Sequence, residues 1–529
     1  MAKPIRALRS DPADPLRLFQ AGAYREALET LAVRPEVRQG SDRAGAILAA
    51  RAELRLNEPA AARARLAHLA QRDPTDVTVR ALSGIAAFLD GEHDAGVHAL
   101  EATHREAAPG EGRAEAAYWA AWAAYAQRRL DAADRWLTKA LDEAKGIWFA
   151  RGLALGGWIA EARGDYGSSA RSFRLALGAV REGAERDDYL VAAILQALAS
   201  FAAEIGDAEL GEYVDAQAEE FRWPTDAGEH RFQTLVHRGL AALDRGDVDG
   251  ALARFEEAEA IAQRPVLIAE LQLERADVYR LIGEPTAARR LLIAAARGLR
   301  AADWSAAHIE DQMALLECVG LAARLDEHSA SEWLMRYSAL AKDDDGRYAL
   351  TRDRRVHALE VHARGLAEAG LGEGGRASQV REALALWESL GYVRRALVAA
   401  ADLLALGERV ENGRLRALTA ALPDHPLTAT LQRYLGPVPT GEGDGVILSP
   451  EQRRVLEALC AGVSVRDMAL QWGRSEFTIR NHLKKLFAKL HVVSSAALVA
   501  KAMSSGLVGA TPTLPPRKPP RIREEAQEG

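Results

Sequence analysis

The sequence has 529 residues, with 75 acidic against 68 basic side chains and 48% hydrophobic residues. This hydrophobic content is enough to build a core and excludes global disorder, and the length predicts several domains or one long repeat array with a smaller module. Two cysteines, Cys318 and Cys460, exclude a disulfide framework and a cysteine-rich zinc site. Because the first residues contain no apolar signal region and no run of about 18 apolar residues occurs, we expect a cytoplasmic protein without a membrane span.

The charge is unevenly distributed along the chain. Residues 446–509 contain nine basic and four acidic side chains, a net charge of +5, whereas residues 1–445 carry −13. A basic module after an acidic body predicts that any contact with a polyanion lies at the C-terminal end. Small modules also vary in charge by chance, so the charge alone does not identify a nucleic-acid-binding module.

Up to about residue 440 the sequence has a helical period, because Ala, Leu, Arg and Glu recur at three- and four-residue spacing. Self-comparison finds turn positions at Gly22, Asn57, Gly91, Arg128, Gly164, Gly246 and Gly283. Five residues after the turns stand Ala27, Ala62, Gly96, Ala133, Ser169, Ala251 and Ala288, and nine after them stand Leu31, Leu66, Leu100, Leu137, Phe173, Phe255 and Leu292. Seven residues before the last six turns stand Ala50, Gly84, Ala121, Gly157, Gly239 and Ala276.

This register predicts helix pairs. The turn residue ends the first helix with φ > 0, the small residues let two helices approach closely, and the large residue fills the hole between them. Pro15 precedes the first turn, so we expect its leading helix to be short. The pattern resembles the tetratricopeptide repeat from about Leu16 to Ala296, most clearly in GDYGSSARSFRLAL and GDVDGALARFEEAEA. The segment from Arg381 resembles the last repeats of bacterial regulators that carry such arrays.

A stacked array of this kind presents a concave surface to a partner protein or a small-molecule effector. The aromatic cluster Tyr118, Trp119, Trp122 and Tyr125 could form a ligand cage, but its spacing favours ordinary packing between helices. For His93, His98 and His104 we expect surface positions, because no further ligand group accompanies them. No phosphate-binding loop, nucleophile elbow or zinc-protease motif occurs, so the sequence predicts no catalytic residue, no metal and no cofactor.

The segment from Leu448 to Leu507 has the caps of four short helices. Ser449, Ser464, Ser475 and Ser494 each precede an apolar helical pattern, with Gln452 completing a capping box after Ser449. A short helix, a turn around Gly473 and a longer helix make the helix-turn-helix arrangement.

The third of these helices carries the charge. Thr478, Ile479, Leu483, Leu486 and Leu490 form its predicted inward stripe, while Arg480, Asn481, Lys484, Lys485 and Lys489 point outward. Arg480/Lys484 and Lys485/Lys489 are like-charge pairs one turn apart, which a bound polyanion would neutralise. Without the helix-turn-helix context, a solvated surface helix would be the better interpretation.

This segment resembles the DNA-binding domain of LuxR/GerE-type bacterial transcription regulators. The resemblance rests on the LSP…E…VL opening, the G-x-S turn, the T-I-R-N-H-L core of the third helix and the K-L-x-V-x-S ending. It implies base contacts from Arg480, Asn481 and Lys484, phosphate contacts from Ser464, Thr478, Lys485, Lys489 and Ser494, and dimerisation through the last helix. The sequence departs from the family pattern at Trp472, Arg474, His491 and Ser495.

Together these observations predict an all-α chain, a tetratricopeptide-like helical solenoid followed by a small four-helix LuxR-type domain. We expect an N-terminal extension (1–15), the array (16–435), a linker (436–446), the helix-turn-helix domain (447–508) and a disordered Pro-rich tail (509–529). The expected function is a transcription regulator whose array senses a partner protein or ligand and whose C-terminal domain binds double-stranded DNA as a homodimer. The alternative is an interaction scaffold whose helix-turn-helix makes protein contacts, and nothing in the sequence supports an enzyme.

Overall fold

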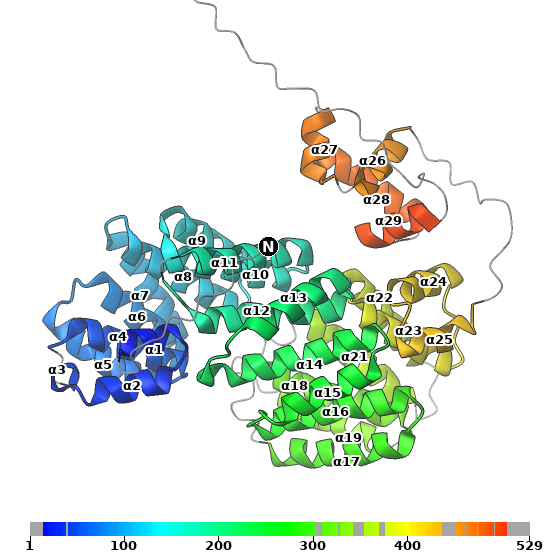
Figure 1. The fold of residues 1–529 in the computed structure, drawn as a ribbon, viewed down its shortest axis with the longest axis horizontal. Coiled ribbons are helices and arrows are strands. Elements are labelled where there is room, and N and C mark those ends of the chain that lie inside the picture. The colour runs from blue at the N-terminus through cyan, green and yellow to red at the C-terminus, as the bar shows by residue number, and fades with distance from the viewer. Residues whose placement is uncertain are drawn as a thin grey trace, which may run out of the picture. The chain divides into compact units, whose positions relative to one another are not determined.

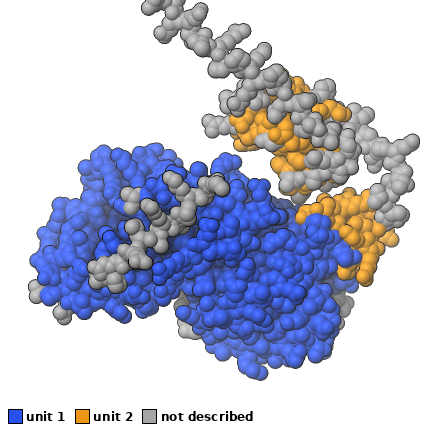
Figure 2. All heavy atoms as spheres, viewed as in Figure 1, with its two compact units in different colours: residues 1–408, 422–429 blue, residues 409–421, 430–529 orange. Residues whose placement is uncertain are grey.

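The computed structural model describes residues 14–38, 41–183, 185–302, 304, 309–325, 328–341, 354–369, 376–435, 450–461, 463–472, 474, 476–490, 492 and 494–504. Within these residues every regular element is a helix, which confirms the predicted all-α class (Figure 1). The chain divides into two compact units, residues 1–408 with 422–429 and residues 409–421 with 430–529 (Figure 2). The N-terminal extension before residue 14, the linker and the Pro-rich tail lie outside the described residues.

The first unit is built from helix pairs in chain order. Up to residue 183 the helices are α1 (Pro15–Gln20), α2 (Tyr24–Ala32), α3 (Pro35–Arg38), α4 (Arg43–Arg55), α5 (Pro59–Arg72), α6 (Val77–Leu89), α7 (His93–Glu106), α8 (Glu111–Ala126), α9 (Leu130–Glu143), α10 (Gly146–Ala162) and α11 (Tyr166–Glu182). The six residues of α1 agree with the short leading helix that Pro15 predicts.

The pairs continue after residue 185. These helices are α12 (Asp188–Ile205), α13 (Ala208–Glu220), the 3₁₀ helix η1 (Thr225–Ala227), α14 (Gly228–Asp244), α15 (Val248–Glu259), α16 (Pro265–Leu281), α17 (Pro285–Ala301), α18 (Ile309–Arg324), α19 (Ala330–Ala341), α21 (Arg354–Ala369), α22 (Arg376–Leu390) and α23 (Val393–Ala405). Helix α24 (Asn412–Ala421) belongs to the second unit, and α25 (Pro426–Gln432) begins in the first unit and ends in the second.

The predicted turn residues all have left-handed backbone conformation. The φ angles are 71° at Gly22, 59° at Asn57, 93° at Gly91, 56° at Arg128, 77° at Gly164, 75° at Gly246 and 83° at Gly283. Asn57 and Arg128 adopt this conformation in place of glycine, at some cost in backbone energy. Further left-handed glycines, among them Gly206 and Gly391, mark turns of the less regular pairs. The helical-hairpin register read from the sequence is therefore confirmed.

Small and large residues of the register meet inside each pair. A Cβ atom added to Gly157 of α10 would lie 2.8 Å from the ring of Phe173 of α11, closer than two carbons can approach. Gly239 and Phe255 repeat this contact at 2.5 Å. Ser169, the small residue five after the Gly164 turn, donates a hydrogen bond to the Gly157 carbonyl oxygen at 2.7 Å. The glycine thus leaves a space on one helix, and the aromatic ring of the next helix fills this space.

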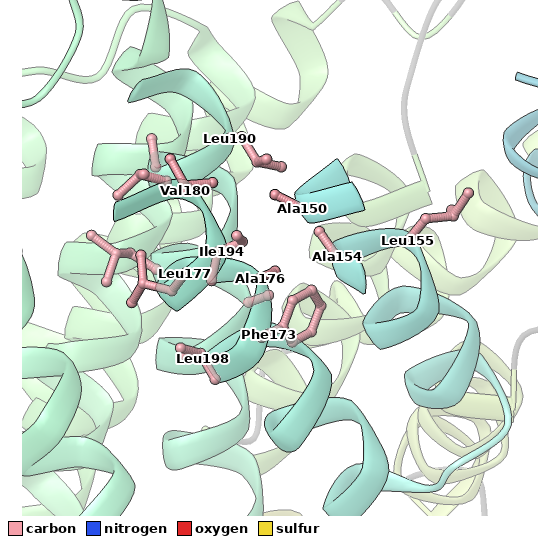
Figure 3. Close-up of a cluster of buried hydrophobic side chains, with 14 of the residues drawn as sticks. Ala150, Ala154, Leu155, Phe173, Ala176, Leu177, Val180, Leu190, Ile194 and Leu198 are labelled. Atoms are coloured by element: carbon pink, nitrogen blue, oxygen red, sulfur yellow. The ribbon is translucent and has the colours of Figure 1, made fainter. Parts of the chain in front are cut away.

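The core of successive pairs is continuous. Figure 3 shows Phe173, Ala176, Leu177 and Val180 of α11 among side chains of α10 and α12. These four positions are spaced at three and four residues, the period that places them on one helix face, and each is at most 8% exposed. A pair therefore buries its apolar face only when its neighbours are stacked against it.

One described helix, α12, is long and apolar enough to cross a membrane by length and composition. Its side chains are 72% buried within the array, where it packs against α11, α13, α14 and α23. Its apolar character is accounted for by this position in the core.

Ion pairs join helices of the array that are about 190 residues apart in the sequence. Arg355 of α21 lies 3.1 Å from Glu161 of α10, and Arg394 of α23 lies 3.1 Å from Glu204 of α12. The Tyr166 and Tyr392 rings also meet, with centroids 5.4 Å apart. The last described pairs of the first unit therefore close back onto its middle, which no local pattern in the sequence predicts.

One expectation about the array needs correction. His104 is not a surface residue, because it is 6% exposed, with its ring beside Trp136 and its Nδ1 3.3 Å from the Arg113 carbonyl oxygen. Burial lowers the pKa of His104 and so favours the neutral ring. In the aromatic cluster Tyr118 packs in the core as expected, but Trp122 and Tyr125 also line a cavity.

We expect the stability of the array to depend on Asp244. Both of its carboxylate oxygens are buried without a hydrogen-bond partner among the described residues, and Arg394 Nε and His425 Nε2 each lie 3.9 Å from its Oδ1. Burial raises the pKa of Asp244 from 3.8 to about 7. The carboxyl is then protonated when folded but ionised when unfolded between these pH values, so native stability falls as pH rises through this range.

Asp244→Asn removes this proton linkage. Between pH 5 and pH 8 we expect the free energy of unfolding of the native protein to fall by about 2 kcal/mol more than that of Asp244→Asn. Urea unfolding of both proteins at each pH measures this difference. Asp142→Asn, at an exposed position on α9, is the control and should give a difference that is constant with pH. If the difference in unfolding free energy between Asp244→Asn and the native protein is also constant with pH, the raised pKa assigned to Asp244 is contradicted.

Candidate nucleic-acid interface

The described helices after residue 449 form a small bundle with its own core. They are α26 (Pro450–Cys460), α27 (Val465–Trp472), α28 (Glu476–Leu490) and α29 (Ser495–Ser504). Their shared apolar cluster includes Val455 and Leu456 of α26, Met468 of α27 and Leu498 of α29, each fully buried. Helices α26 and α27 both pack on α28, which is therefore held along its inner side.

The two faces of α28 differ as the sequence predicts. Ile479, Leu483, Leu486 and Leu490 are at most 6% exposed and face the core. The exposed side chains on the opposite side are Arg480, Asn481, Lys484, Lys485 and Lys489. Thr478 is half-buried at the border of the two faces. The outer face thus presents four cations and one amide, with an acid only in the first turn, at Glu476.

The five outer side chains of α28 differ in the contacts that they make with other residues of the domain. Arg480 pairs with Glu476 one turn earlier, with its Nη2 2.9 Å from a carboxylate oxygen. Lys489 donates a hydrogen bond of 2.9 Å to Oε1 of Gln452, a buried residue of α26. For Lys484 and Lys485 no ion pair is formed within the described part of the chain. Sequence reasoning missed both contacts, although the spacing of Glu476 and Arg480 at i and i+4 was a visible signal for the first.

The hydroxyl groups of Ser464 and Ser494 cap helices. The N–H of Asp467 donates to Ser464 Oγ at 3.2 Å, and the N–H of Ala497 donates to Ser494 Oγ at 3.1 Å, which confirms both as N-cap residues. Ser464 also donates its own proton to the Asp467 carboxylate at 2.7 Å. Its hydroxyl is therefore already engaged, whereas the Ser494 hydroxyl has no acceptor among the residues that the structure describes. Ser449 and Ser475 lie outside the described residues.

The positions that depart from the LuxR pattern keep the fold intact. Trp472 is covered by the guanidinium of Arg454, 4.4 Å above its ring, which is a cation–π contact between α26 and α27. Arg474 is exposed, and its N–H donates to the Ala469 carbonyl oxygen at the end of α27. Ser495 is exposed at the start of α29. His491 lies outside the described residues.

Comparison with known proteins identifies this bundle. The family described as bacterial regulatory proteins, luxR family, matches residues 446–502. The probable HTH-type transcriptional regulator GfsR of Streptomyces halstedii is 35% identical over 85 residues, which are 16% of this chain and 32% of that protein. This chain therefore matches about a third of the length of that regulator. An all-α repeat array is thus combined with a luxR-family helix-turn-helix domain, as the resemblance in the sequence indicates.

The whole chain also has distant likenesses among solved structures. The APC/C hetero-tetramer Cut9–Hcn1 is similar over 80% of this chain and 96% of that chain, with 13% identity and a TM-score of 0.26. The Naa15/Naa10 complex bound to HypK is similar over 93% and 80%, with 15% identity and a TM-score of 0.26. Similarity at this level defines neither fold nor function, and the tetratricopeptide-like description rests on the helical hairpins themselves.

Proposed function

We propose that this protein is a DNA-binding transcription regulator of the cytoplasm and that α28 enters the major groove of double-stranded DNA. The observation that carries the proposal is the outer face of α28, where exposed cations and an amide lie on the second helix of a helix-turn-helix. Arg480 and Lys484, one turn apart, and Asn481 beside them contact base edges, since Arg and Lys suit guanine and Asn suits adenine. Lys485 and Lys489 lie further round the helix, toward a DNA strand.

Phosphate groups are the proposed partners of the remaining polar side chains. Lys485 and Lys489 provide charge, Ser494 provides a hydroxyl group, and Thr478 lies at the border of the outer face. Ser464 contributes less than the other groups, because its proton is already donated to Asp467. A homodimer formed through α29 would bring two copies of α28 to half-sites on the same duplex.

The array is the proposed sensor for a partner protein or a small-molecule effector. Its first unit contains a cavity of about 570 Å³, lined by side chains of α8, α10, α12, α14, α16 and α18. This volume falls within the range of small-molecule sites. Binding there would change DNA binding only if the ligand distinguishes two states of the protein.

The experiment that tests DNA recognition is selection from a random duplex library with the full-length chain. We expect enrichment of a short motif, because base contacts from α28 distinguish sequences by about 1–3 kcal/mol each. Recovery of duplexes without sequence enrichment would restrict the protein to nonspecific binding, and recovery of none would refute the proposed function.

We further expect residues 446–507 to fold as an isolated helical domain that retains weak DNA binding. The apolar cluster of α26 to α29 is complete within this fragment, so its core does not require the array. Circular dichroism and a cooperative thermal transition measure folding, and fluorescence anisotropy with labelled duplex measures binding. A folded fragment with no affinity for DNA would count against both the domain and its function.

A further inference from the structure

The cavity in the first unit has an aromatic wall and a polar floor. Trp122 of α8, Trp158 of α10 and Tyr189 of α12 contribute the wall. The floor lies along α16, where Leu267, Glu270 and Glu274 all line the cavity. Since these three positions follow at i, i+3 and i+7, one face of α16 is turned into the cavity.

The cations that line the cavity are already engaged. Each of three arginines lies beside a carboxylate that also lines the cavity, and Arg128 lies over the Tyr125 ring. The pairs, with the distance between charged atoms, are Arg264–Glu229 (2.6 Å), Arg355–Glu161 (3.1 Å) and Arg395–Glu204 (3.2 Å). The cavity therefore has little cationic charge to offer to an anionic ligand.

On the α16 face of the cavity, in contrast, one carboxyl group has no partner among the described residues. Glu274 makes no hydrogen bond and no ion pair with the described residues. Glu270, one turn earlier, accepts two contacts of 3.2 Å from Nε2 of Gln233. Two acids at i and i+4 destabilise an isolated helix. A cation between them would remove this repulsion.

A second acceptor comes from His230 of α14. Its Nδ1 contacts Oε1 of Gln196, so the proton lies on Nδ1 and Nε2 presents a lone pair. That Nε2 is buried and has no hydrogen-bond partner among the described residues, although His230 lines the cavity. Burial lowers the pKa of His230 to about 4, so the ring is neutral at pH 7. The group thus requires a donor that the described residues do not supply.

We propose that this cavity binds a small molecule that carries an ammonium group on an apolar or aromatic body. The ammonium donates to Glu274 and to the acceptors beside it, and the body lies against Trp122, Trp158 and Tyr189, where the ring faces also attract a cation. The inference rests on the proposed sensing function of the array and names the chemical class of its ligand. It is independent of DNA binding by α28.

Proton release provides a signature of this binding mode. Burial raises the pKa of Glu274 to about 7, against the opposing effect of nearby arginines. The charged or titratable groups around it are Glu270 and Asp277 of the same helix, Glu204 of α12, His237 of α14, Glu317 and Arg324 of α18, His362 of α21, and Arg394 and Arg395 of α23. A bound ammonium favours the ionised carboxylate, so about half a proton is released from Glu274 per ligand at pH 7.

The test is isothermal titration calorimetry of the full-length protein with tryptamine and its neutral analogue tryptophol. We expect tryptamine to bind more tightly than tryptophol by about tenfold or more, since a charge-assisted hydrogen bond to a carboxylate is stronger than a neutral one. Titrations in buffers of different ionisation enthalpy measure the released proton. No binding of tryptamine at about 10 mM, or equal binding of tryptophol, would overturn the proposal.

Variants separate this site from the rest of the protein. Glu274→Gln keeps the shape of the side chain and should lower the affinity for tryptamine by about tenfold or more and abolish the proton release. Glu256→Gln, exposed on α15, is the matched control and should change neither. Unchanged affinity in Glu274→Gln would refute the assignment. Duplex binding without ligand, measured on the same proteins, should stay at the native level, so failure of the ligand site and failure of DNA binding are distinguishable.

Discussion

Phe173→Ala is expected to destabilise the repeat array by about 3–5 kcal/mol, the range for removing a buried aromatic side chain. Phe173 has no exposed surface and fills the space left by Gly157 on the preceding helix. Hydrogen exchange followed by mass spectrometry on the full chain should show loss of protection first in α10, α11 and α12. Urea unfolding measures the change in free energy.

A pair of glycine variants tests the physical reason for this effect. Gly157→Ala should destabilise the array by about 1–3 kcal/mol, because the new methyl group meets the Phe173 ring. Gly178→Ala on α11 is the matched control, since no atom lies within 4 Å of its added Cβ, and should stabilise by about 0.5–1 kcal/mol. Combining Gly157→Ala with Phe173→Leu should recover part of the loss. Equal effects at Gly157 and Gly178 would contradict the hairpin packing.

Arg480→Ala should weaken binding to the preferred DNA site by about 1–3 kcal/mol and relax the preference at one base pair. Its side chain is 69% exposed, so only the surface pair with Glu476 is lost and folding is preserved. Lys489→Ala should instead weaken all duplexes similarly and reduce the salt slope by about one unit. Competitive binding to a site library at several salt concentrations measures both effects.

Lys485→Ala is the better matched phosphate variant. The hydrogen bond from Lys489 to the buried Gln452 means that Lys489→Ala also removes a contact inside the domain, whereas Lys485 makes no ion pair within the described residues. Thermal unfolding of each variant separates a loss of stability from a loss of affinity. If Arg480→Ala scales every affinity equally while Lys485→Ala alters the preferred sequence, the two faces of α28 are assigned wrongly.

The sequence predicts the features that local rules determine. The left-handed turns at Gly22, Asn57 and Arg128 follow from a register that repeats every helix pair. Ser464 and Ser494 are recognisable because a cap acts on a backbone N–H three residues away. The outer face of α28 follows from helical periodicity, whereas the proposal of Arg480, Asn481 and Lys484 as its base contacts comes from the resemblance to LuxR/GerE-type regulators.

Features that depend on long-range contact are not predictable in this way. His104 is buried because its ring packs against Trp136, 32 positions along the chain, and Trp122 lines a cavity to which α16 and α18 also contribute side chains. Glu274 and Asp244 look like ordinary helical acids in the sequence. Their burial in the folded array raises their pKa values, although the nearby Arg394 of α23 acts in the opposite direction.

The most direct test of the central claim is the salt dependence of binding between the full-length protein and a random-sequence duplex. If the four cations on the outer face of α28 contact phosphates of a random duplex, the logarithm of the affinity should fall linearly with the logarithm of salt concentration, with a slope of about −3 to −4. A helix-turn-helix that serves protein contacts would give no such slope. Affinity that is absent at low salt, or that does not change with salt, would contradict the proposal that this protein binds DNA.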